Sequence, residues 1–207
     1  MDEKQQRAVE LFPSVLLSVL GVIQALAFEL LWEEGLPGVA RWRDVGATAT
    51  GVLQAVAVFQ GGIVMWALYA SLVLRLRWLP SVRDLVVPFV LGALQFALVE
   101  LMAPEQLPWW FAVLALIFAL AMATNYAAYV AAGRLDPAIL RGESQVLSSY
   151  APSLVTVVGL VACAGLVAWT GPTSPAAAAA VLAANAGLLV QLVVLRRYWN
   201  RDLHLGA

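Results

Sequence analysis

The chain has 207 residues, of which 62% are hydrophobic and only 12% are charged, and its formal net charge is −1. Ordinary soluble domains carry about 25% charged residues, so this composition excludes a water-soluble globular protein of this size. Several apolar stretches exceed the roughly 18–20 residues that cross a bilayer, and they predict an all-α, polytopic membrane protein. The sequence has no cluster of basic and aromatic residues of the kind that binds nucleic acid, so nucleic acid is not expected as a partner.

The apolar stretches predict six transmembrane helices in one domain that covers residues 1–207. Their approximate ranges are 11–32, 48–74, 84–103, 109–132, 150–171 and 175–195. The first is expected to be a membrane helix and not a cleaved signal peptide, because it is too long and no cleavage site of small residues follows it. Two helix starts are marked: Ser81 with Asp84 predicts a capping box, and Ser174 before Pro175 predicts an N-cap.

The distribution of Lys and Arg predicts the orientation of these spans. If the N-terminus is cytoplasmic, ten of the twelve Lys and Arg residues lie in cytoplasmic segments, and only Arg41 and Arg43 lie outside. Both termini are therefore expected in the cytoplasm, in a plasma membrane or a bacterial inner membrane. The segment 133–150 is the longest cytoplasmic connection and predicts a short interfacial helix. The sizeable outer loop is expected at residues 33–48.

Two segments of the chain resemble each other. Val19–Pro37 reads VLGVIQALAFELLWEEGLP, and Val90–Pro108 reads VLGALQFALVELMAPEQLP. Nine of the nineteen aligned positions are identical, and they include a Gln, two Glu and a Pro, which lipid exposure alone does not favour. The similarity predicts two duplicated helical hairpins, 11–74 and 84–132, related by an axis near the membrane normal. The third hairpin, 150–195, is more distant, and whether it is related to the first two stays open.

Glu29 and Glu100 are matching residues of this repeat and lie within predicted spans. A carboxylate inside a span costs several kcal/mol unless it is paired, protonated or facing water, so the two residues are candidates for an acidic outer vestibule. If the repeated helices pack around a common axis, both carboxylates are expected to face inward and to meet. Arg41 and Arg43 are then candidates for gating or for counter-ions. The alternative is an interfacial position, because both residues lie near the outer ends of their spans.

Amide side chains form a second group of polar residues within the spans. Gln24 and Gln95 lie five residues before the glutamates, which is about 140° around the helix axis. Six amides in five spans indicate a polar seam inside the bundle: Gln24, Gln54, Gln60, Gln95, Asn125 and Asn185. The alternative for each one is an interhelical hydrogen bond, worth about 0.6 kcal/mol in a membrane. Gly61-Gly62, beside Gln60, indicates either close helix packing or a hinge.

The absence of certain side chains limits the chemistry. The one histidine is His204, in the C-terminal tail, and the one cysteine is Cys163. Bis-histidine haem, zinc and dithiol sites and a Ser-His-Asp triad are therefore excluded, and we expect neither a cofactor nor enzymatic activity.

These features predict a small channel or transporter for a proton, a cation or a small solute. The alternative is a non-transporting scaffold or subunit of a larger membrane complex, in which the alanine ladders Ala123-Ala127-Ala131 and Ala176-Ala180-Ala184 would pack against other chains. A third hypothesis is a lipid-handling protein. The lipid bilayer is the expected partner, and a homo-oligomer and an assembly with other membrane subunits both stay open.

Overall fold

The structure is a computed structural model that describes residues 3–42, 44–137 and 143–202. Its helices are α1 (Glu3–Leu30), α2 (Leu36–Ala40), α3 (Val45–Arg75), α4 (Val82–Glu100), α5 (Leu107–Leu135), α7 (Glu143–Thr170) and α8 (Pro175–Asp202). A π-helical turn (Leu31–Gly35) joins α1 to α2, and a 3₁₀ turn (Pro104–Gln106) precedes α5. No strand occurs in the described ranges, which confirms the all-helical class.

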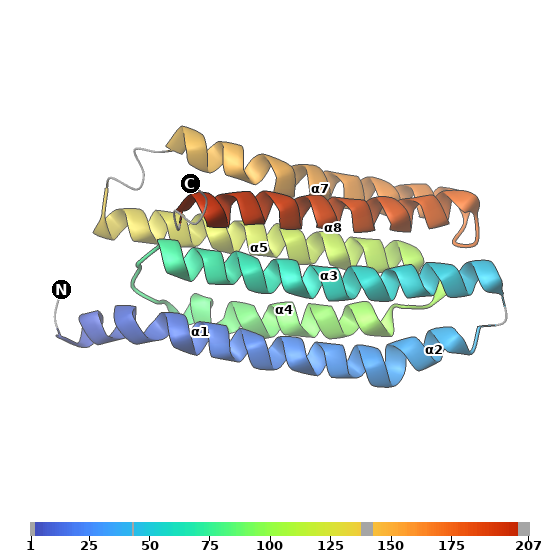
Figure 1. The fold of residues 1–207 in the computed structure, drawn as a ribbon, viewed down its shortest axis with the longest axis horizontal. Helices are drawn as coiled ribbons and strands as arrows, with labels where there is room; N and C mark the ends of the chain where they lie inside the picture. Colours follow the sequence, from blue (N-terminus) through green and yellow to red (C-terminus); the bar gives the residue numbers. More distant parts are fainter. Residues whose placement is uncertain (1–2, 43, 138–142, 203–207) are drawn as a thin grey trace.

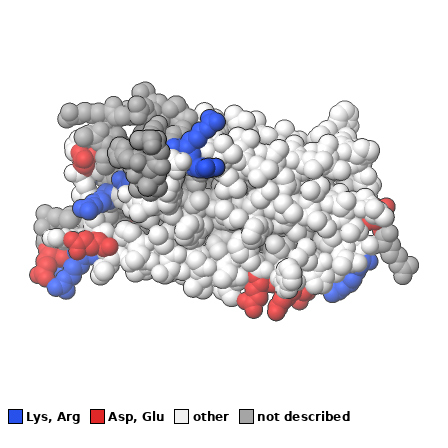
Figure 2. Space-filling view, in the orientation of Figure 1, with Lys and Arg blue, Asp and Glu red and all other residues white. Residues whose placement is uncertain are grey.

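Six helical segments of the described chain are long and apolar enough to cross a membrane. They are Glu3–Ala40, Val45–Arg75, Val82–Glu100, Pro104–Leu135, Tyr150–Thr170 and Pro175–Arg197. The six predicted apolar helices are therefore confirmed as helices long enough to span a membrane, which supports an integral membrane protein. The visible face in Figure 2 is largely uncharged, and its charged side chains lie mostly toward the two ends of the bundle.

The helices run side by side along the long axis of the molecule, and both chain termini lie at the same end (Figure 1). Helix α1 packs on α3 and α4, and α4 packs on α5. Helix α8 packs on α3, and α7 packs on both α5 and α8. The connection from α3 to α4 and the end of α5 lie at the terminus end of the bundle, whereas α2 lies at the opposite end.

The two marked helix starts have the hydrogen bonds that the sequence predicts. The backbone N–H of Ser81 donates to the Asp84 carboxylate at 2.8 Å, and the capping box is complete. The Ser174 hydroxyl accepts from the Ala177 N–H at 3.2 Å at the start of α8. Each cap satisfies a backbone donor that the helix itself leaves without a partner.

The first span extends farther than the sequence predicts. The boundary at residue 32 and the loop at 33–48 are wrong, because the helix continues through the π-helical turn to Ala40. Leu31, Gly35 and Val39 are buried and continue the inner face of α1 at four-residue spacing, so the extension buries apolar surface. Pro37 lies in the first turn of α2, where a missing N–H costs no helical hydrogen bond.

The predicted interfacial helix at 133–150 overlaps two longer helices. Helix α5 continues to Leu135, and α7 begins at Glu143, so these parts of the segment belong to helices that enter the bundle. Residues 138–142 lie outside the described residues.

Candidate functional site

Gln24 of α1 and Gln95 of α4 meet inside the bundle. The Gln24 amide Nε2 donates to Gln95 Oε1 at 3.0 Å, and the two side chains are only 7% and 4% exposed. They are matching residues of the two similar segments. The helices approach closely beside this bond, because a Cβ on Gly92 would lie 2.5 Å from Ile23 Cγ2. The alternative interpretation of these glutamines, an interhelical hydrogen bond, is therefore confirmed.

Helix α3 packs against this amide pair through Gly62. A Cβ at Gly62 would lie 2.6 Å from Gln24 Oε1 and 2.6 Å from Phe28 Cζ, whereas a Cβ at Gly61 would meet nothing within 4 Å. The cavity between these residues measures about 10 Å³, at the lower limit for one water molecule. Close packing thus accounts for Gly62, and the amide pair joins helices instead of lining a passage.

Glu29 and Glu100 are both exposed, and neither forms a hydrogen bond or ion pair with any described residue. On α1 the buried face contains Gln24, Ala27 and Leu31, so Glu29 points away from it. Figure 2 shows a group of acidic side chains along the edge that α1 forms in Figure 1. The inward-facing arrangement expected from the sequence is therefore not what the structure has.

The two arginines proposed as partners of these carboxylates do not complete a vestibule in the described structure. Arg41 is exposed and forms no ion pair with Glu29 or Glu100. Arg43 lies outside the described residues. Neither glutamate lines the polar cavity, the cavity beside the amide pair or either of two grooves on the described surface of the bundle.

Three further amides lie along α3 and α8. Gln54 is 1% exposed, and its amide has no hydrogen-bond partner among the described residues. Asn185 Nδ2 donates to the Val181 carbonyl at 2.9 Å and to the Leu53 carbonyl of α3 at 3.1 Å, which ties α8 to α3. Gln60 is half-buried, and its Oε1 accepts no hydrogen bond from the described chain. The structure thus brings Asn185 against α3 beside Gln54, at some distance along α3 from Gln60.

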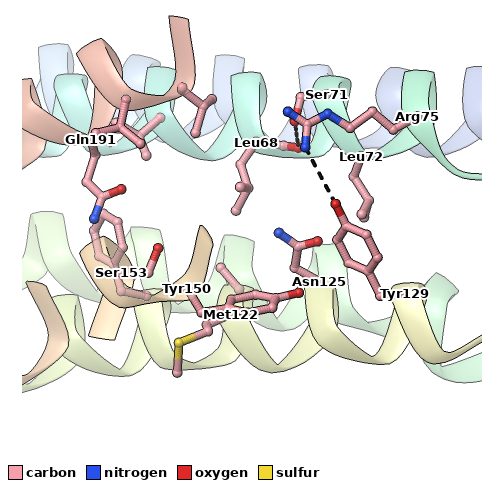
Figure 3. A pocket seen from close by; sticks show the side chains of 15 residues that line it. Leu68, Ser71, Leu72, Arg75, Met122, Asn125, Tyr129, Tyr150, Ser153 and Gln191 are labelled. Carbon is pink, nitrogen blue, oxygen red and sulfur yellow. Dashed lines mark hydrogen bonds between the residues drawn. The ribbon is translucent and has the colours of Figure 1, made fainter. Parts of the chain in front are cut away.

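The sixth amide, Asn125, lines a polar cavity between α3, α5, α7 and α8 (Figure 3). The cavity measures about 60 Å³, which by the volume of a buried water is room for about four to six water molecules. Its polar lining residues come from all four helices: Ser71, Arg75, Asn125, Tyr129, Tyr150, Ser153 and Gln191. Apolar side chains such as Leu68, Phe118 and Val194 complete the wall.

Hydrogen-bonding groups in this cavity are only partly satisfied. An Arg75 guanidinium N–H donates to the Tyr129 hydroxyl oxygen at 3.5 Å (Figure 3), and Gln191 Nε2 donates to the Thr156 hydroxyl at 2.8 Å. The Tyr150 hydroxyl and Asn125 Oδ1 are buried and have no partner among the described residues. Such groups cost about 1–3 kcal/mol each when nothing binds them, so they mark a place for a polar ligand or water.

Charge distinguishes this cavity from the rest of the bundle. Among the described residues of its lining, Arg75 is the one basic residue, and none of them is an Asp or a Glu. A charged side chain beside membrane-spanning helices is a candidate for a functional role by default. Sequence reasoning identified only Asn125 here. Arg75 served there only to predict orientation, and the half-buried Tyr129 and Tyr150 gave no signal in the sequence.

A larger, open groove lies at the terminus end of the bundle. It measures about 940 Å³ and is lined by the first turns of α1, the connection after α3 and the end of α5. Its charged residues are Glu10, Arg75, Arg77 and Asp136. Among the described residues, Arg75 alone belongs to the linings of both this groove and the polar cavity.

Comparison with known protein families, with characterised proteins and with solved structures found no match to this chain.

Proposed function

We propose that the protein is a small membrane transporter or channel for a small polar solute, and that the polar cavity between α3, α5, α7 and α8 is its solute site. The observation that supports this proposal is a group of unsatisfied polar side chains, with one guanidinium, inside a bundle of apolar helices. Helix packing in lipid does not require such a group, because each unsatisfied polar atom is costly there.

The cavity favours a small solute over the other species that the sequence left open. Its described lining includes the basic Arg75 and no carboxylate, so it offers a proton or a metal cation no anionic ligand. The exposed Glu29 and Glu100 then act as interfacial anchors at the membrane surface, and Arg41 has the same role. Gln24, Gln95 and Asn185 hold helices together and support the cavity indirectly.

The proposal also includes cytoplasmic chain termini and a duplicated helical hairpin. The excess of Lys and Arg supports cytoplasmic termini in a plasma membrane or a bacterial inner membrane, so the groove at the terminus end faces the cytoplasm. The hydrogen bond between the matching residues Gln24 and Gln95 supports a duplicated hairpin, because an axis along the membrane normal keeps matching residues at equal depth.

The alternative scaffold function has less support. Ala180 and Ala184 of one alanine ladder are buried within the chain itself, so this ladder packs helices of the same molecule. Ala123 of the other ladder is exposed and is its only fully exposed member.

Osmotic swelling of proteoliposomes tests the proposal. Vesicles that contain the protein are mixed with glycerol, urea, glycine, acetate or lactate, and solute entry is followed by light scattering. We expect at least one solute to enter faster than in protein-free vesicles, and Asn125→Leu to abolish the difference while E29Q/E100Q preserves it. Entry at the protein-free rate for every solute, or an equal rate in Asn125→Leu, would contradict the proposal.

A further inference from the structure

We infer that the polar cavity binds a small neutral alcohol with more than one hydroxyl group, of the size of ethylene glycol or glycerol. The inference rests on the proposed function, because it names the solute class of the same cavity, and binding is measured separately from transport. It follows from the uncharged hydroxyl and amide groups of the lining, whose hydrogen-bond donors and acceptors match those of such an alcohol.

The basic residue of the cavity is already engaged within the protein. Arg75 donates to the Tyr129 hydroxyl at 3.5 Å and takes part in a further interaction, so its guanidinium is not assigned to the solute. The other described residues of the lining include no Asp, Glu, Lys or His. An ionic solute would therefore lose its hydration without gaining a counter-ion from them, which is costly, whereas a neutral solute needs only hydrogen bonds.

Two buried groups in the lining lack hydrogen-bond partners among the described residues. Asn125 Oδ1 can only accept, whereas the Tyr150 hydroxyl can both donate and accept. Figure 3 shows both side chains around the same space. One hydroxyl group of a solute can accept from Tyr150 and donate to Asn125 Oδ1 through a single oxygen. A carboxylate has no proton for the Asn125 oxygen, so it would satisfy only one of the two groups.

A second donor and a second acceptor are left in the lining. The Ser71 hydroxyl donates to the Leu68 carbonyl at 3.2 Å, so its oxygen can still accept. Tyr129 accepts through its oxygen, so its own proton can still donate. These two groups match a second hydroxyl, and apolar side chains such as Leu68 and Phe118 face the C–H groups. The volume of about 60 Å³ limits the solute to about six non-hydrogen atoms, the size of glycerol.

Tyr126 provides a matched control for Tyr150. The two rings pack edge to face with centroids 6.3 Å apart, but Tyr126 is exposed and does not line the cavity. Replacement by phenylalanine removes one oxygen from either residue and keeps the ring. The Tyr150 oxygen has no hydrogen-bond partner in the described chain, so its removal should leave the fold as stable as before.

Solute entry and solute binding together test the inference. Proteoliposome swelling compares glycerol and ethylene glycol with glycine and sodium lactate, and saturation-transfer NMR in glycerol-free nanodiscs detects binding of the same four compounds. We expect the two alcohols to exceed the protein-free rate of entry by more than glycine and lactate do. Tyr150→Phe should lower glycerol entry and saturation transfer about three- to tenfold, the effect of losing one hydrogen bond, while Tyr126→Phe stays within about twofold of the wild type.

The possible outcomes separate this inference from the proposed function. Unchanged glycerol entry and binding in Tyr150→Phe, or equal losses in the two tyrosine variants, would overturn the inference. Faster entry of lactate or glycine than of glycerol would also overturn it, but would still support transport. Saturation transfer to glycerol without entry of any solute would refute transport and keep the inference. Neither transfer nor entry would overturn both.

Discussion

Replacement of Gly62 by alanine tests the close packing of α3 on the amide pair. The new Cβ would lie 2.6 Å from Gln24 Oε1 and from Phe28 Cζ, so the amide and the ring must both move. Extra atoms in a packed interior cost about 1–3 kcal/mol. Alanine also gains about 0.5–1 kcal/mol over glycine in a helix, which partly offsets this cost. Gly61→Ala has the same gain and meets nothing within 4 Å, so it is the matched control.

The difference between the two variants therefore isolates the steric overlap. We expect Gly61→Ala to be as stable as the wild type or slightly more stable, and Gly62→Ala to be about 1–3 kcal/mol less stable than Gly61→Ala. Reversible unfolding with sodium dodecyl sulfate in mixed micelles, followed by circular dichroism, measures both free energies. If the two variants have equal stability, Gly62 does not pack against Gln24, and the hinge interpretation of the Gly-Gly pair returns.

Three further predictions use the same unfolding assay or the swelling assay. Gln95→Leu leaves the buried Gln24 amide without its partner and should cost about 1–3 kcal/mol, whereas the double variant with Gln24→Leu should recover most of that loss; a double variant less stable than the single one would contradict the pairing. Gly171→Ala should cost about 1–2 kcal/mol, because this residue has φ of +90° at the end of α7; an unchanged free energy would refute the strain. The exposed pair variant E29Q/E100Q should leave both stability and solute entry at the wild-type level; slower entry would restore the carboxylates to the pathway.

Features that depend on local sequence were predictable. The length of an apolar run determines whether a helix spans the membrane, and a capping box needs only residues three apart, as at Ser81 and Asp84. An interhelical hydrogen bond was one of the two interpretations of each amide, but the sequence did not identify Gln24 and Gln95 as partners. The sequence also placed Glu29 about 140° from Gln24, so a helix that turns the amide inward turns the carboxylate outward. That relation was available from the sequence, but which residue faces inward depends on tertiary packing.

The polar cavity was not predictable, because its walls come from four helices that are distant in the sequence. Arg75 ends α3, Asn125 lies in α5, Tyr150 begins the span in α7, and Gln191 lies near the end of α8. Each of them has an ordinary local explanation, such as orientation by a terminal arginine or an interhelical amide. Only the lateral order of the helices, which hydrophobic periodicity does not determine in a membrane, brings these residues to one space.

The two polar regions of the bundle differ in the space around their polar groups. Between α1 and α4, Gln24 and Gln95 share one hydrogen bond, Gln24 Oε1 has no partner among the described residues, and the remaining space has about the volume of one water molecule. Around Asn125 and Tyr150, the buried oxygens lack partners, and the space is about six times larger. A space of one water molecule admits no larger ligand, whereas unpaired groups around a larger volume gain a hydrogen bond for each ligand atom that reaches them. This difference in volume is why the proposed solute site is the cavity of α3, α5, α7 and α8, and why the α1–α4 contact is assigned to stabilisation of the bundle.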